Sequence, residues 1–177
     1  MDAAAATILR ASLVLLLGSA ALHKLRDPLG FRLTLQAYEL VPQPFLIGAA
    51  GAVILLELVL TTWLASGIAL AGAGAAAAAL LLAYAAAIGV NVRRGRLDID
   101  CGCAGPASRV PLSSALVVRN LIVAAAAALL IVPTNARTIT WIDALTISAG
   151  IASLSASWLA AQRMLALAPA LSRLRQA

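Results

Sequence analysis

The chain has 177 residues, of which 63% are hydrophobic and only 11% are charged, and its mean hydropathy is +0.99. Because soluble domains are about 45–50% apolar and about 25% charged, this composition excludes an ordinary soluble globule, a coiled coil and a disordered chain. The net charge of +6 comes from basic residues that flank apolar segments, so nucleic acid is excluded as a partner and the lipid bilayer is expected instead.

Five apolar stretches follow one another along the chain, each long enough to cross a bilayer as a helix. They lie at about residues 3–22, 45–65, 68–90, 114–132 and 140–161. Long alanine runs favour helices over strands, and transmembrane strands would show an alternating pattern. The sequence therefore predicts one all-α integral membrane domain over residues 1–177, with a four-helix-bundle core and five transmembrane helices.

The connections between these stretches differ in length. The first connection carries apolar residues at the spacing of a short amphipathic helix that lies along the membrane interface. These residues are Phe31, Leu35 and Tyr38. The second and third stretches are joined by a very short turn near Ser66 and Gly67, which predicts an antiparallel helical hairpin. The longest polar loop covers residues 91–113.

The basic residues divide unequally between the two faces that alternating spans create. One face carries Arg10 and Arg137. The other carries ten basic residues: Lys24, Arg26, Arg32, Arg93, Arg94, Arg96, Arg109, Arg163, Arg173 and Arg175. The positive-inside rule places this second face in the cytoplasm. We therefore expect a multi-pass protein of the bacterial inner membrane whose 91–113 loop is cytoplasmic.

The two cysteines of the chain, Cys101 and Cys103, lie in this loop and are separated only by Gly102. A structural disulfide usually joins distant segments, since its stabilising effect grows with the length of the closed loop. Glycine adopts the positive φ that a tight turn between neighbouring thiols needs. The adjacent Asp100 disfavours the reactive thiolate, whereas the arginines of the loop favour it.

Three interpretations of the cysteine pair stay open. The leading one is redox chemistry, in which the two thiols form a strained disulfide that is easily reduced. The second is a soft metal ion such as Cu(I) bound by the two thiolates. The third is that the thiols carry no chemistry. Because His23 is the only histidine, a four-ligand Cys/His zinc site within one subunit is excluded.

Glu57 is the most informative polar residue inside a predicted span, because a carboxylate in the membrane normally faces the bundle interior or a cavity. Its functional interpretation is a proton relay or a contact to a quinone-like ligand. Its structural interpretation is an ion pair or hydrogen bond with Arg119, His23 or Lys24, since buried polar groups need partners. Arg119 is expected near the interface, where an arginine can extend to water, and Tyr84 is expected to be an interfacial anchor.

Four segments of the chain resemble the methylamine-utilisation protein MauE family, within the broader DoxX-like group of membrane proteins. They are Ser-Ala-Ala-Leu-His-Lys-Leu-Arg-Asp-Pro at residues 19–28, residues 31–42, Leu-Glu-Leu at 56–58, and Asp-Cys-Gly-Cys-Ala-Gly at 100–105. The resemblance covers about residues 5–135. It implies a four-helix-bundle membrane core and maturation of an exported, disulfide-rich dehydrogenase subunit beside a thioredoxin-like partner. It also implies that Cys101 and Cys103 form the exchange pair, with links to quinone redox chemistry among relatives.

The sequence thus predicts a redox-associated membrane protein that supports thiol–disulfide exchange or the maturation of a disulfide-containing client. In that case the chain is a component of a thiol–disulfide oxidoreductase system, for which a quinone is one candidate cofactor. Two alternatives remain: a Cu(I)-binding metallochaperone or transporter, and a non-catalytic membrane anchor subunit. The implied partner works outside the inner membrane, which conflicts with a cytoplasmic cysteine loop. An exported loop therefore remains the alternative orientation.

Overall fold

The computed structural model describes residues 1–102, 110–135, 137–138 and 140–174. The elements are α1 (Ala3–Arg26), α2 (Pro28–Tyr38), the 3-10 helix η1 (Gln43–Phe45), α3 (Leu46–Ser66), α4 (Leu70–Arg93), α5 (Ser114–Ala128), the 3-10 helix η2 (Leu129–Ile131) and α6 (Trp141–Leu174). Within these residues the only β-type pairing is an isolated bridge between Asp100 and Pro111. The predicted all-α fold class is therefore confirmed.

Within the described part of the chain, five helices are long and apolar enough to span a membrane: α1, η1 with α3, α4, α5 with η2, and α6. This confirms the predicted multi-pass protein with five transmembrane helices. Two of the helices are longer than expected. The first continues through Arg26 instead of ending near residue 22, and the last continues to Leu174 instead of ending near residue 161.

The end of α1 follows from its local sequence. Basic side chains in the last turn interact favourably with the negative end of the helix dipole, so the helix continues past His23. Asp27 then leaves the helical conformation because a residue before proline is disfavoured there. Its side chain accepts a hydrogen bond from the amide of Gly30 at 2.8 Å, which starts α2 at Pro28. The short helix predicted around Phe31 and Tyr38 is present, and its position along the membrane interface stays a prediction.

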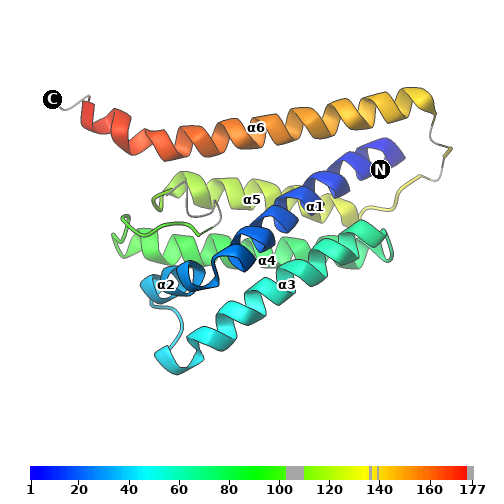
Figure 1. The fold of residues 1–177 in the computed structure, drawn as a ribbon. Coiled ribbons are helices and arrows are strands. Elements are labelled where there is room, and N and C mark those ends of the chain that lie inside the picture. The colour runs from blue at the N-terminus through cyan, green and yellow to red at the C-terminus, as the bar shows by residue number, and fades with distance from the viewer. Residues whose placement is uncertain (103–109, 136, 139, 175–177) are drawn as a thin grey trace.

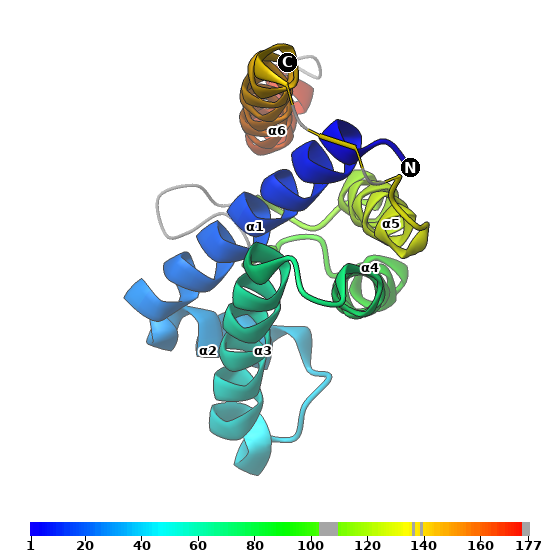
Figure 2. The same cartoon turned by 90° about the vertical axis from the view of Figure 1, so that its right-hand side faces the viewer.

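Helices α1, α3, α4 and α5 form the bundle, with α1 packed across α3 and α4 packed beside α5 (Figure 1). Their buried side chains recur four residues apart, which places them on one face of each helix. The main core cluster includes Leu13, Leu17, Leu60, Leu64, Ala73, Ala77, Leu80, Leu81, Ala124, Ala127 and Leu130. Helix α6 lies along α1 and away from α3 and α4 (Figure 2).

The two ends of the bundle carry different connections (Figure 1). The loop end, as we name it, holds α2, the carboxyl end of α6 and the described parts of the α4–α5 connection, residues 94–102 and 110–113. The opposite end holds the amino terminus, the α3–α4 turn and the start of α6. At that turn Gly67 has a φ of +72°, which explains the tight hairpin that the sequence predicts.

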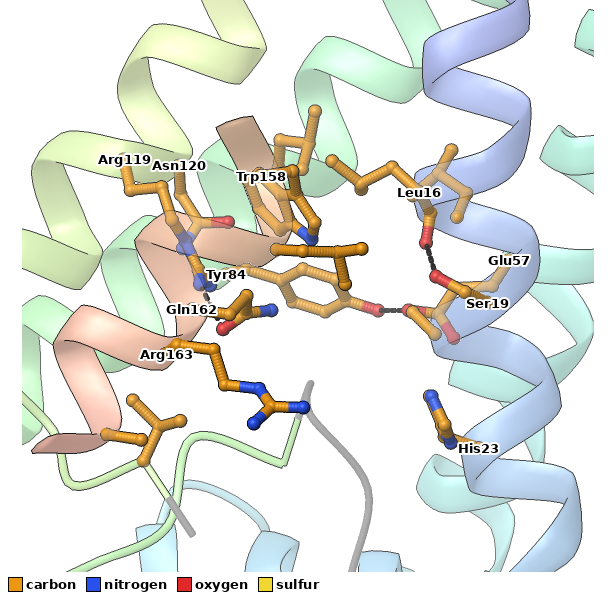
Figure 3. A pocket seen from close by; sticks show the side chains of 16 residues that line it. Leu16, Ser19, His23, Glu57, Tyr84, Arg119, Asn120, Trp158, Gln162 and Arg163 are labelled. Carbon is orange, nitrogen blue, oxygen red and sulfur yellow. Dashed lines mark hydrogen bonds between the residues drawn. The ribbon is translucent and has the colours of Figure 1, made fainter. Parts of the chain in front are cut away.

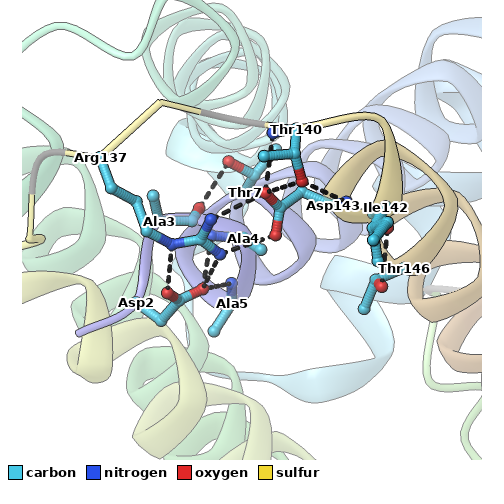
Figure 4. A network of polar contacts seen from close by, with 10 residues as sticks. All are labelled: Asp2, Ala3, Ala4, Ala5, Thr7, Arg137, Thr140, Ile142, Asp143 and Thr146. Atoms are coloured by element: carbon cyan, nitrogen blue, oxygen red, sulfur yellow. Dashed lines mark hydrogen bonds and ion pairs between the residues drawn. The ribbon is translucent and has the colours of Figure 1, made fainter.

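At the end opposite the loop, a polar network ties the start of α6 to the start of α1 (Figure 4). The Arg137 guanidinium donates hydrogen bonds to Asp2 at 2.8 Å and to Asp143 at 2.7 Å. Asp2 also accepts from the amide of Ala4 at 2.8 Å and so caps α1. The hydrogen bond from Arg137 lowers the pKa of Asp2 below its usual value of 3.8.

Replacing Arg137 with glutamine should loosen the first turns of α6. The variant keeps the polarity but loses the charged bridge, so amide hydrogen exchange at residues 140–145 should rise modestly at pH 7. Because the pKa of Asp2 is lowered in the folded protein, its contribution is present at neutral pH and lost as the pH falls through that lowered pKa. The matched control is Arg96→Gln, which breaks an exposed pair with Glu39 at the loop end. Unchanged exchange in the Arg137 variant would contradict the tethering role.

Candidate functional site

A buried ion pair joins the last turn of α1 to the middle of α3. Lys24 Nζ lies 2.5 Å from Glu57 Oε1, and the two side chains are 3% and 0% exposed. The hydroxyl of Tyr84, on α4, donates to the same Glu57 oxygen at 2.7 Å. Of the three partners that the sequence suggests for Glu57, the structure therefore supplies Lys24.

Aromatic rings complete the surroundings of the ammonium group. Lys24 Nζ lies 5.1 Å from the ring centre of Phe31 and 5.4 Å from that of Tyr84. Both distances suit cation–π attraction, which strengthens when water is excluded. Tyr84 is thus a hydrogen-bond donor of the site and not an interfacial anchor. The sequence gives one weak signal for this role: Tyr84 lies within an apolar stretch, and the hydroxyl of a buried tyrosine usually finds a hydrogen-bond partner.

The second carboxylate oxygen of Glu57 is buried and has no hydrogen-bond partner among the described residues. A charged acceptor without a donor is costly in a low-dielectric interior. Glu57 lines a cavity of about 290 Å³ between α1, α4, α5 and α6, which we call the lateral cavity (Figure 3). The unpartnered oxygen is itself enclosed by protein atoms and does not face the open space of this cavity.

The lateral cavity combines an apolar wall with several polar groups. Its polar lining residues are Ser19, His23, Glu57, Tyr84, Arg119, Asn120, Gln162 and Arg163. Arg119 does not extend toward water as expected. It donates to Gln162 at 3.0 Å, and its guanidinium lies 4.6 Å from the ring centre of Trp158 (Figure 3). Arg119 consequently joins α5 to α6 instead of pairing with Glu57.

Two further cavities flank Lys24 on the side of the loop end. The first, which we call the thiol cavity, has about 90 Å³ and is lined by Lys24, Tyr38, Tyr84 and Cys101 together with apolar residues. The second has about 500 Å³ and includes His23, Lys24, Asp100 and Gly102 in its wall. The ion pair therefore separates the lateral cavity from the space beneath the cysteine segment.

Cys101 is held in place by backbone contacts at the base of its loop. Its side chain is buried, and its amide donates to the carbonyl of Val110 at 2.9 Å. The Tyr38 hydroxyl donates to the Cys101 carbonyl at 3.4 Å. Asp100 accepts from the Val110 amide at 3.0 Å, so it orders the loop base.

Gly102 adopts the positive φ that the sequence suggests, at +73°. A Cβ atom at this position would also lie 3.0 Å from the Thr34 side chain of α2. Both observations restrict the position to glycine. Cys103 lies outside the described residues, so the geometry of the cysteine pair stays a prediction.

The structure places the predicted site residues in two groups. Lys24, Glu57, His23 and Cys101 surround the adjoining cavities, whereas Arg119 lines the far wall of the lateral cavity, where it bonds Gln162 of α6 instead of Glu57. Among the described residues, no three His, Cys, Asp or Glu side chains gather closely enough to hold a metal ion. A Cu(I) site would need both thiolates, and it stays a prediction because it includes Cys103.

Comparison with known proteins gives one match. The profile of the family described as Methylamine utilisation protein MauE matches residues 2–133, which is well over half of the chain. This range contains the ion pair and both cysteines, whereas α6 lies beyond it. No curated protein and no solved structure matches the chain. The chain belongs to the MauE family of methylamine-utilisation membrane proteins.

Proposed function

We propose that this membrane protein supports thiol–disulfide exchange through Cys101 and Cys103, and so assists the maturation of a disulfide-containing client beside a thioredoxin-like partner. The observation that carries the proposal is the position of Cys101. Cys101 and Lys24 line the same small cavity, and Gly102 after the cysteine has the backbone conformation of a tight turn. A cation near a thiol favours the thiolate, which is the nucleophile of exchange.

The proposed chemistry has two steps. A thiolate of the pair attacks a disulfide of the partner, whose S–S bond breaks as a mixed disulfide and a partner thiolate form. The second thiolate then attacks the mixed disulfide, so that the Cys101–Cys103 bond closes and the partner leaves as a dithiol. Two electrons pass to the partner, together with the two protons that the cysteines lose. Oxidation of a client dithiol follows the same steps in reverse, and a second disulfide or a quinone restores the pair.

Glu57 has a place in this proposal as a proton relay. Its ion-pair partner Lys24 lines the thiol cavity, whereas Glu57 itself belongs to the wall of the lateral cavity. A carboxylate between two cavities can accept a proton that leaves the thiols and pass it on through water. The alternative is a purely structural ion pair, which the Lys24 and Glu57 variants in the Discussion separate from a relay.

The side of the membrane on which exchange takes place is part of the proposal. The loop end carries the basic residues that favour a cytoplasmic position. An exported client would instead require the opposite orientation. The identity of a trapped partner decides between them, since a cytosolic thioredoxin-like protein and an exported one lie on different sides.

Single Cys→Ser variants of the intact protein should trap mixed disulfides. In membranes from cells that express Cys103→Ser or Cys101→Ser, one partner should migrate with the protein on non-reducing gels and separate from it after dithiothreitol treatment. The remaining thiol can attack but cannot resolve, so the adduct should accumulate well above its level in the wild type. Mass spectrometry identifies the partner.

The control is the double variant Cys101→Ser/Cys103→Ser, which should trap nothing. An adduct that persists in the double variant would come from another thiol and would contradict the proposal. The same holds if the double variant keeps the full client disulfide content in cells. That result would leave an anchoring role.

A further inference from the structure

The lateral cavity depends on a helix that lies outside the family match. Helix α6 follows residue 133 and contributes Trp158, Gln162 and Arg163 to the wall, whereas the bundle helices and the α4–α5 connection supply the rest (Figure 3). Apart from this region, most of α6 is exposed, and its main packing partner is α1. Part of the cavity wall thus comes from a helix that the family match does not include.

The described residues that line the lateral cavity carry an excess of positive charge. Arg119 and Arg163 contribute two guanidinium groups, while the Glu57 carboxylate is already paired with Lys24. Arg119 Nε is buried without a hydrogen-bond partner. Arg163 points into the cavity and has no hydrogen-bond partner among the described residues (Figure 3). Guanidinium groups with unused donors are suited to phosphate or carboxylate oxygens.

The surroundings of the cavity are those of a lipid-facing surface. Next to it, Leu15 and Leu22 on α1 and Leu159 on α6 are 53%, 46% and 63% exposed. Such apolar side chains can cover acyl chains, whereas a water-soluble anion gains nothing from them. Basic pockets between transmembrane helices are known sites for anionic lipid headgroups. A cavity of about 290 Å³ is suited to a headgroup rather than to a whole lipid.

We propose that the lateral cavity binds the headgroup of an anionic glycerophospholipid of the phosphatidylglycerol type. Arg163 donates to the phosphate, and the positive charge of the neighbouring Arg119 guanidinium stabilises it. The acyl chains lie in the bilayer along α1 and α6. Binding of this lipid adds to the contacts that already hold α6 to the bundle near the loop end, the Arg119–Gln162 hydrogen bond and the packing of Leu165.

Fluorescence of Trp158 tests the proposal directly, because this residue lines the cavity. Trp63→Phe and Trp141→Phe leave Trp158 as the sole tryptophan of the full-length chain. The protein is placed in phosphatidylcholine nanodiscs that contain increasing fractions of phosphatidylglycerol with brominated acyl chains. Quenching should saturate at a low fraction of the brominated anionic lipid, whereas brominated phosphatidylcholine should quench in proportion to its amount.

Arg163→Gln should raise the half-saturating fraction of brominated phosphatidylglycerol about fivefold, as expected for the loss of one basic contact near the membrane surface. Arg94→Gln is the matched control, since it removes the same charge from an exposed position at the loop end outside the cavity. It should leave the curve unchanged. Arg163 has no hydrogen-bond partner among the described residues, so its replacement should not impair folding.

Three outcomes would overturn the proposal. One is equal quenching by the two brominated lipids, which would mean that Trp158 contacts only bulk bilayer. Another is a quenching curve that Arg163→Gln does not alter. A third is displacement of the brominated anionic lipid by millimolar inorganic phosphate, which would reveal a site for a soluble anion. None of these outcomes depends on the cysteines, so the lipid site and the exchange function are tested independently.

Discussion

Replacement of Lys24 by methionine should be among the most destabilising single substitutions in this chain. Methionine preserves the length and apolar packing of the side chain, but it leaves the Glu57 carboxylate fully buried with Tyr84 as its remaining hydrogen-bond donor. An uncompensated buried charge of this kind costs about 3–5 kcal/mol. Thermal unfolding of the purified protein in detergent micelles measures the effect.

A second variant removes the negative charge of Glu57 together with the positive charge of Lys24. Lys24→Met combined with Glu57→Gln should recover much of the lost stability, because neither charge remains buried alone. Arg96→Met provides the matched control. It breaks an ion pair with Glu39 that has the same 2.5 Å separation but is exposed to solvent. Exposed pairs contribute about 0–1 kcal/mol, so the control should unfold close to the wild type.

These variants also distinguish a structural ion pair from a proton relay. If Glu57 is a relay, the double variant Lys24→Met/Glu57→Gln, in which neither charge is buried alone, should fold yet slow the formation of mixed disulfides in the single-cysteine background. If the pair is only structural, the variant that still folds should form them at the normal rate. A Lys24→Met protein as stable as Arg96→Met would contradict the structural role of the buried pair.

The fold was predictable because membrane helices are specified locally. Each span carries its own run of apolar residues, so hydropathy alone locates five helices. The residues at which the helices end were harder to predict. The His23–Arg26 segment was expected to end the first span because basic residues usually lie outside the bilayer core. In the structure the helix continues through Lys24, whose charge is paired with Glu57. Because Glu57 lies 33 residues later in the chain, the local sequence does not reveal this pairing.

The candidate site was predictable only where a residue type leaves few options. A carboxylate inside a span had to face the protein interior, and a glycine between two cysteines had to provide a positive φ. Tyr84, by contrast, had a common alternative as an interfacial residue. The lateral cavity could not be found from the sequence at all, because residues of all five bundle-forming and flanking helices α1, α3, α4, α5 and α6 line it together. Its Arg163 belongs to a tail that was expected to lie along the membrane surface.

Substitution of Gly74 is the second change that we expect to destabilise the protein strongly. This residue is buried on α4 where the helix meets the end of α5 and η2. A Cβ atom at this position would lie 2.7 Å from Leu130 Cβ and 2.8 Å from the carbonyl oxygen of Ala127. The Ala127 oxygen belongs to the backbone and the Leu130 Cβ is bonded directly to it, so a change of side-chain rotamer cannot relieve the overlap. Close approach at small residues is a common means of helix association in membranes.

Gly74→Ala should therefore push α4 away from α5 and destabilise the protein by about 1–3 kcal/mol, the usual cost of an overpacked core. Gly51→Ala on α3 is the matched control, since a Cβ atom there would meet nothing within 4 Å. Alanine favours a helix more than glycine, so this control should unfold at the wild-type temperature or slightly above it. Thermal unfolding in the same detergent compares the two variants. Equal stability of both would show that the α4–α5 contact can open without cost, and that some other contact holds these two helices together.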